Sequence, residues 1–146
     1  TDVEMLNEYY FETMHHEFAH ILHQKKNYPT EYNQISAADY SSTGWQNRTE
    51  QQAWKLGFVT PYAGMEPQED FVEVIANYLV KPDGFWENML ANAGTEGATK
   101  IQTKFDMVKE WLMTAWNIDI DELRTIIIRR SGDIDSILNE KIAYNE

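Results

Sequence analysis

The sequence contains no cysteine, and it is poor in positive charge. The absence of cysteine excludes a disulfide-bonded scaffold, a thiolate metal site and a cysteine nucleophile. Lysine and arginine together number 12 against 24 acidic residues, which gives a formal net charge of -12 and a pI near 4.6. Because lysine and arginine are what holds nucleic-acid phosphates, a chain this acidic is not expected to bind nucleic acid or an anionic membrane.

Long hydrophobic runs are also missing. The longest apolar strings are short pieces such as Ile126–Ile128, far below the roughly 18 residues of a membrane-spanning helix. We therefore expect no transmembrane segment in this chain. With 146 residues, of which 42% are hydrophobic and 25% charged, the chain has the size and composition of one folded domain, and no repeat or linker divides it.

Alternating strand patterns are almost absent, and helical patterns take their place. A long first helix is predicted over residues 3–26, because apolar residues recur there at helical spacing without Gly or Pro; they are Leu6, Tyr10, Met14, Ile21 and Leu22. The first part of the chain continues with an irregular stretch and an extended, ordered loop over residues 59–65. Further helices are predicted over residues 49–58, 67–80, 85–93, 99–116, 121–130 and 133–140, with Asp121 and Asp133 as N-caps. We expect a mostly α, single helical domain.

The residues with the clearest chemistry lie inside the first predicted helix, where His16-Glu17-Phe18-Ala19-His20 matches the pattern H-E-x-x-H. Residues four apart share one face of a helix, so both imidazoles can point at one ion. Glu17 lies beside that face, where it can reach a water on the metal without ligating it. Because zinc lowers the pKa of such a water toward about 7 and a carboxylate can take its proton, the spacing predicts a zinc site with Glu17 as general base.

A tetrahedral catalytic zinc site needs a third protein ligand. The metzincin pattern would have Gly three residues and His six residues after His20, but His23 and Lys26 stand there, so that class is excluded. His23 shares the face of His16 and His20, and we expect it in the wall of the site rather than on the ion. His15 points about a quarter turn away and is expected to be structural.

An acidic third ligand is available on the predicted helix 67–80. Glu69 and Glu73 are four residues apart, so one can bind the ion while the other accepts the far N–H of a ligand histidine. The spacing alone leaves Glu69, Asp70 and Glu73 open as the ligand. Acidic residues also favour the first turn of any helix, so a solvated acidic helix start is the competing interpretation.

Together these residues resemble the gluzincins, the thermolysin-like zinc peptidases. In that pattern the third ligand is a Glu on a later helix, and an acid four residues on supports a ligand histidine. The resemblance implies that Glu69 binds zinc and that Glu73 is the supporting acid. Tyr62 stands seven residues before Glu69, as in the lethal-factor-like branch, which implies that Tyr62 donates a hydrogen bond to the oxyanion of the tetrahedral intermediate.

The longer strings 16–24, 57–63 and 69–73 are similar to zinc-binding metallopeptidase lipoproteins encoded beside outer-membrane nutrient-import systems of Gram-negative bacteria, also described as substrate import-associated zinc metallohydrolases. The resemblance covers about half of the chain. It implies a peptide or protein substrate and import-system components as partners. It also implies a location in the cell envelope, in the periplasm or on the outer-membrane surface, on a lipid anchor upstream of Thr1.

Gluzincins normally carry a small β-sheet before the metal helix, and only fifteen residues precede His16 here. We therefore expect that sheet to be reduced or absent. The chain is then a zincin-like catalytic domain or its C-terminal part, with a metal-site half (1–81) and a helical tail (82–146). Three functions are compatible with the sequence: a zinc-dependent metallopeptidase, a non-catalytic metal-binding accessory module of an import system, or a helical interaction domain in which the motif is accidental. The presence of both Glu17 and Tyr62 favours the peptidase, since a purely structural site needs neither.

Overall fold

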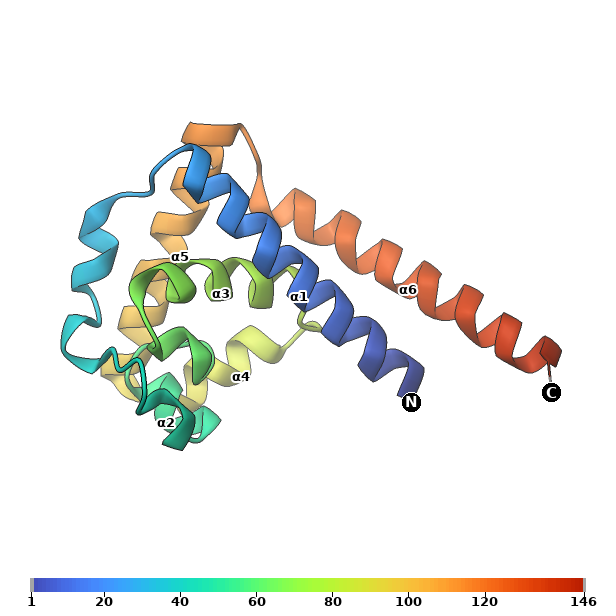
Figure 1. Ribbon diagram of the computed structural model, residues 1–146, viewed down its shortest axis with the longest axis horizontal. Coiled ribbons are helices and arrows are strands. Elements are labelled where there is room, and N and C mark those ends of the chain that lie inside the picture. The colour runs from blue at the N-terminus through green and yellow to red at the C-terminus, as the bar shows by residue number, and fades with distance from the viewer. Residues whose placement is uncertain (1, 146) are drawn as a thin grey trace.

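The computed structural model describes the backbone of residues 2–145, and the side chains of all of these but residues 2–4, 7 and 145; this part of the chain holds helices and turns but no strand. The mostly α architecture predicted from the sequence is thereby confirmed for the described residues. Short 3₁₀ turns fill much of the connections before α2 and α3 (Figure 1). The helices are α1 (Asp2–Lys25), α2 (Glu50–Lys55), α3 (Pro67–Val80), α4 (Phe85–Asn92), α5 (Gly94–Trp116) and α6 (Ile120–Asn145).

The helix α3 lies at the centre of the fold and is buried along most of its length. It packs against α1, α5 and α6, and α1 crosses in front of it in Figure 1. Pro67 stands at the start of α3, where its missing N–H is no loss and its ring presets the helical φ angle. The first turn of α3 is thereby held against α1, which carries the H-E-x-x-H motif. Its buried residues are Asp70, Phe71, Val72, Glu73, Val74, Ile75, Ala76, Asn77 and Leu79.

The helix α1 buries one face and leaves a second apolar face exposed. The buried side includes Phe11, Ala19 and Leu22, which belong to the hydrophobic core or border it. The periodicity that predicted this helix was correct about its conformation, but most of the residues that formed the pattern are not buried in the core. Leu6, Tyr10, Met14 and Ile21 are all exposed.

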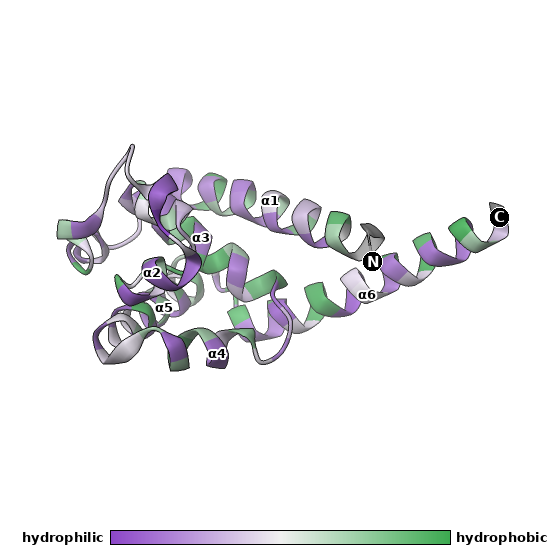
Figure 2. Cartoon of the chain, turned by 90° about the horizontal axis from the view of Figure 1, so that it is seen from below, coloured by the Kyte–Doolittle hydropathy of each residue, from purple (hydrophilic) through white to green (hydrophobic). Residues whose placement is uncertain are grey.

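The two last predicted helices, 121–130 and 133–140, are wrong as separate elements, because they form the single helix α6. Gly132 lies inside α6 and does not interrupt it. One Gly in a helix interior costs only about 1 kcal/mol relative to Ala, so the helix formers on both sides carry the helix through. The C-terminal half of α6 extends away from the other helices, and apolar residues recur along it (Figure 2). Exposed among them are Ile134, Ile137, Leu138 and Ile142.

Other helix ends also differ from the prediction. α5 begins at Gly94 instead of near residue 99. Asp121 and Asp133 are not N-caps: the Asp119 carboxylate accepts the backbone N–H of Asp121 at 2.9 Å, and Asp133 lies within α6. Such ends depend on individual side chain–backbone hydrogen bonds, which the apolar periodicity of a sequence does not reveal.

The loop over residues 59–65, which carries Tyr62 and is called the Tyr62 loop below, is ordered, but the prediction that it is extended is wrong. It contains the 3₁₀ turn η4 (Tyr62–Gly64). The buried indole N–H of Trp54 donates to the carbonyl of Val59 at 3.0 Å, and the N–H of Ala63 donates to the Thr60 hydroxyl at 3.1 Å. These bonds satisfy backbone groups that an extended loop would leave unpaired, and they fix the loop beside α3.

Within the part of the chain that the structure describes, no helix combines the length and the apolar character needed to cross a membrane. This agrees with the expectation from the short apolar runs of the sequence.

Candidate metal centre

Two helices bring the motif histidines and one carboxylate to a single point. His16 and His20 project from α1, and Glu69 projects from the first turn of α3. One Glu69 oxygen, Oε2, lies 2.9 Å from Nε2 of His16 and 3.1 Å from Nε2 of His20. Among the described residues, these three offer ligand atoms that all lie within 4.8 Å of one another.

The three side chains fit a zinc ion. Two imidazole nitrogens and one carboxylate oxygen are a ligand set that zinc accepts, and three protein ligands leave a fourth position open. Zinc–ligand bonds of about 2.0–2.1 Å place tetrahedral ligands roughly 3.3 Å apart. The observed nitrogen–oxygen distances of 2.9 and 3.1 Å are only a few tenths shorter. A small outward shift of Glu69 would therefore accommodate the ion.

The far nitrogen of His16 is held by Glu73. Nδ1 of His16 lies 3.0 Å from Oε2 of Glu73, and Glu73 is only 6% exposed. Burial opposes the charged form of His16, but the hydrogen bond and charge of Glu73, together with the charge of Glu69, outweigh it and raise the pKa of His16. A hydrogen bond from Nδ1–H to a carboxylate fixes the tautomer in which Nε2 faces the metal position.

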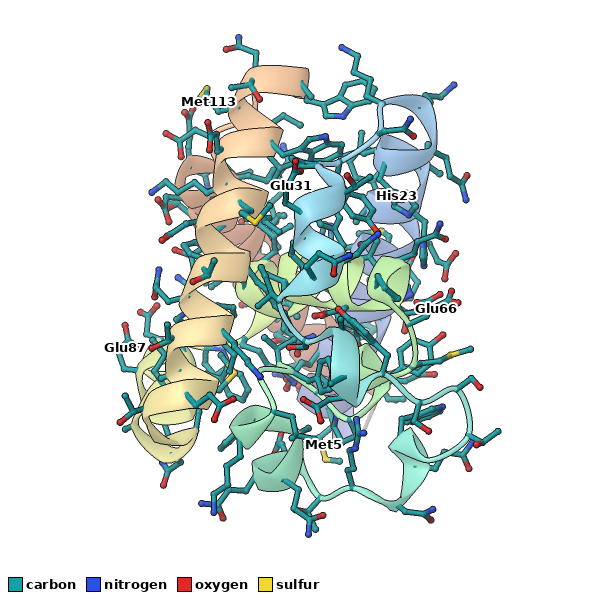
Figure 3. All side chains as sticks on the ribbon, turned by 90° about the vertical axis from the view of Figure 1, so that its left-hand side faces the viewer. Met5, His23, Glu31, Glu66, Glu87 and Met113 are labelled. Atoms are coloured by element: carbon teal, nitrogen blue, oxygen red, sulfur yellow. The ribbon has the colours of Figure 1, made fainter. Side chains whose placement is uncertain are left out.

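The far nitrogen of His20 is held by a third histidine. Nδ1 of His20 lies 2.9 Å from Nε2 of His23. Burial, followed by the nearby charge of His20, lowers the pKa of His23. This favours the neutral form of His23, in which Nε2 can accept the Nδ1–H of His20. Figure 3 labels His23 on α1, above Glu66 in that view. Both candidate ligand histidines thus have Nδ1 occupied and Nε2 turned to the same carboxylate oxygen.

Tyr62 lies at the edge of this cluster. Its ring centroid is 5.8 Å from that of His16 and 5.1 Å from that of Trp45, in an edge-to-face contact. Burial and the charge of Glu69 raise the pKa of Tyr62, so its hydroxyl keeps its proton near neutral pH and can donate. Glu17 is exposed on α1 beside His16, and its charge also raises the pKa of His16.

Two other predicted residues lie outside the cluster. Asp70, one alternative for the third ligand, is fully buried and turned into the core, where its carboxylate contacts Lys104 at 2.8 Å. It also accepts hydrogen bonds from Tyr32 and Tyr40. His15 stacks on an aromatic ring of α1, and burial lowers its pKa, as expected of a structural histidine.

Two residues that hold acidic side chains of α3 in place were not predicted from the sequence: Lys104 contacts Asp70, and Thr60 bonds to Glu73. Lys104 did carry a signal, because it lies at helical spacing with the buried Ile101, Val108 and Trp111 on α5, and a lysine on an apolar face needs a buried partner. Thr60, which donates a hydrogen bond to Glu73 at 2.8 Å, lies within the string 57–63 that carries part of the resemblance, but the resemblance implied no role for it.

Comparison with known proteins places this chain in a family. The family model described as "Putative zinc-binding metallo-peptidase" matches residues 1–121, which include both α1 and α3. The crystal structure of a "putative zinc-binding metallo-peptidase" from Bacteroides caccae is 52% identical, covers 92% of this chain and superimposes with a TM-score of 0.87. This chain spans about half (51%) of the length of that protein. No curated protein matches the chain. The chain thus belongs to the family of putative zinc-binding metallo-peptidases.

Proposed function

We propose that this chain is the metal-bearing part of a zinc-dependent peptidase, in which His16, His20 and Glu69 hold one zinc ion. The observation that carries this proposal is the convergence of both Nε2 atoms on Glu69 while both Nδ1 atoms are engaged elsewhere. A chance H-E-x-x-H sequence on a structural helix would have no reason to turn both metal-binding nitrogens toward one carboxylate.

Bound at this site, zinc would supply a Lewis acid and a water of lowered pKa. Glu17 is exposed beside His16, where its carboxylate can take a proton from the attacking water and return it to the leaving amine. Tyr62, whose raised pKa keeps the hydroxyl protonated, can donate a hydrogen bond to the oxyanion of the tetrahedral intermediate. Glu73 and His23 orient the two imidazoles and take no proton from the substrate.

The competing function is a metal-binding accessory module without catalysis. One observation favours it: the chain spans only about half of its solved relative, so residues that would hold a substrate can lie in the other half of such proteins. The two functions predict the same zinc ligands and differ in turnover alone.

A substitution of Glu17 separates the two functions. Glu17→Gln keeps the size of the side chain but cannot accept the water proton, so we expect unchanged zinc content and a loss of turnover of about 10²–10⁴-fold. Glu110→Gln, at an exposed position of α5, is the matched control and should turn over like the wild type. The assay is cleavage of a mixed peptide library with zinc and with a chelator.

The outcomes are distinct. Chelator-sensitive cleavage that Glu17→Gln abolishes supports the peptidase. Zinc binding without any cleavage by the wild-type protein supports the accessory module. Loss of zinc in Glu17→Gln contradicts the role of Glu17 as a base, because a base does not ligate the ion.

We further propose a cell-envelope location and import-system partners, which rest on the resemblance of strings 16–24, 57–63 and 69–73 alone. Fractionation of the native host, followed by detection of the protein in membrane and soluble fractions, tests the location. Co-purification of import-system components with the native protein tests the partners. A protein recovered only from the cytosol would contradict both expectations.

A further inference from the structure

One threonine hydroxyl connects the Tyr62 loop to the candidate metal centre. The hydroxyl of Thr60 donates to Oε1 of Glu73 at 2.8 Å and accepts the backbone N–H of Ala63 at 3.1 Å. A hydroxyl has one proton to give and an amide N–H can only donate. The direction of both bonds is therefore fixed: the Thr60 hydroxyl donates to the Glu73 carboxylate, and the Ala63 N–H donates to the Thr60 oxygen.

Glu73 receives one hydrogen bond on each oxygen. Oε1 accepts from Thr60 and Oε2 accepts from Nδ1 of His16. At 6% exposure, this carboxylate has little water to replace a lost partner, and a buried charge without its hydrogen bonds is costly. Removing the Thr60 hydroxyl would let the carboxylate rotate or draw in water, and the imidazole of His16 would follow it.

The same threonine also fixes the start of the turn that carries Tyr62. Tyr62 lies between Thr60 and Ala63, so the Ala63-to-Thr60 hydrogen bond closes the chain around it. The centroid of the Tyr62 ring lies 5.8 Å from that of His16 and 5.1 Å from that of Trp45. Loosening the turn would move this hydroxyl relative to the metal position.

We propose that Thr60 is a positioning residue that holds two parts of the centre with one hydroxyl: His16 through Glu73, and Tyr62 through the turn. The hydroxyl of Thr60 bonds to Glu73 and Ala63 and not to a candidate zinc ligand, so it acts through these neighbours. Its effect on zinc affinity stands independently of catalysis, whereas its effect on turnover rests on the proposed function.

The first test measures zinc affinity by competition with a chelator. Thr60→Val has the same shape but no hydroxyl, and we expect a dissociation constant about 10-fold higher, at the lower end of what the loss of an outer hydrogen-bond partner causes. Thr60→Ser keeps the hydroxyl and should stay within about 3-fold of wild type. Thr114→Val, which removes an exposed hydroxyl bonded to the α5 backbone, controls for the loss of a hydroxyl as such and should change nothing.

A double-mutant cycle identifies the path of the effect. If Thr60 acts through Glu73, Thr60→Val should change the dissociation constant by less than about 2-fold in a Glu73→Ala background. Additive effects of the two substitutions would overturn the proposal. An unchanged affinity in Thr60→Val, or a Thr60→Ser protein as weak as Thr60→Val, would overturn it as well.

The second cycle uses turnover at saturating zinc. Thr60→Val should lower kcat several-fold in the wild type but not in Tyr62→Phe, because the hydroxyl that it positions is then absent. An equal loss in both backgrounds would overturn the role toward Tyr62. A wild-type protein that binds zinc but cleaves nothing would contradict the proposed function, and the affinity cycle with Glu73 would still decide whether Thr60 holds His16.

Discussion

Replacing Lys104 by Met should lower the free energy of unfolding by about 3–5 kcal/mol. The ammonium of Lys104 is fully buried and contacts Asp70 at 2.8 Å. It also donates to the hydroxyl of Ser36 at 2.8 Å and to the carbonyl of Gly57 at 2.7 Å, so all three of its donors are used. Met fills a similar volume but leaves the buried carboxylate of Asp70 without its counter-ion. A loss of about 3–5 kcal/mol is a large part of the about 5–15 kcal/mol by which a typical domain is stable.

A neighbouring lysine provides the control. Lys100 lies one turn earlier on α5 and pairs with Glu96 at 3.1 Å, where Glu96 is largely exposed to solvent. Lys100→Met should therefore cost less than about 1 kcal/mol. Both variants are unfolded in urea with a chelator present, so that zinc binding does not add to the measured stability.

A double variant tests the reason for the loss. Burial raises the pKa of Asp70 and lowers the pKa of Lys104, which shows that each charge is held at a desolvation cost. Asp70→Asn removes the charge but keeps an oxygen for only one of the two tyrosine hydroxyls, since Tyr32 and Tyr40 donate to different oxygens of Asp70. Combining it with Lys104→Met should therefore recover part of the lost stability. A Lys104→Met protein no less stable than Lys100→Met, or a double variant as unstable as the single one, would refute the reasoning.

Three further outcomes are expected. Glu69→Ala should abolish tight zinc binding, whereas Glu73→Ala should weaken it only about 10–100-fold; chelator competition measures both, and the reverse order would exchange the two roles. His23→Phe keeps an aromatic ring beside Tyr28 but removes the hydrogen-bond acceptor for Nδ1–H of His20. Zinc affinity should therefore fall about 10–100-fold. An unchanged zinc affinity would contradict the assigned hydrogen bond between His20 and His23. Zinc at 100 times its dissociation constant should stabilise the folded protein by about 2.7 kcal/mol in urea unfolding, and the absence of any shift would show that folding does not create the site.

The sequence predicted those parts of the centre that depend on local geometry. His16 and His20 are four residues apart on one helix, and helix geometry alone puts them on the same face. The third ligand could not be chosen from spacing, because Glu69, Asp70 and Glu73 all lie within the first turns of α3. Helix geometry turns Asp70 about 100° away from Glu69, but the buried partner that it meets there, Lys104, lies far along the chain on α5.

The same limit applies to the fold. Helix periodicity predicted α1 and α3 but not which face of α1 would be buried, since Leu6 and Tyr10 are exposed. The sequence also predicted two helices on either side of Gly132 where the structure has one. That prediction was wrong because a single Gly weakens a helix by too little to end it. Thr60 could not be found, since its role exists only where the folded Tyr62 loop meets Glu73.

The most direct test of the central claim is the metal content of the purified protein. We predict one zinc per chain in the wild type and none in the double variant His16→Ala, His20→Ala. His15→Ala, which changes a neighbouring histidine outside the cluster, should keep its zinc. Full zinc occupancy in the His16→Ala, His20→Ala protein would contradict the account, because the ion would then be bound elsewhere.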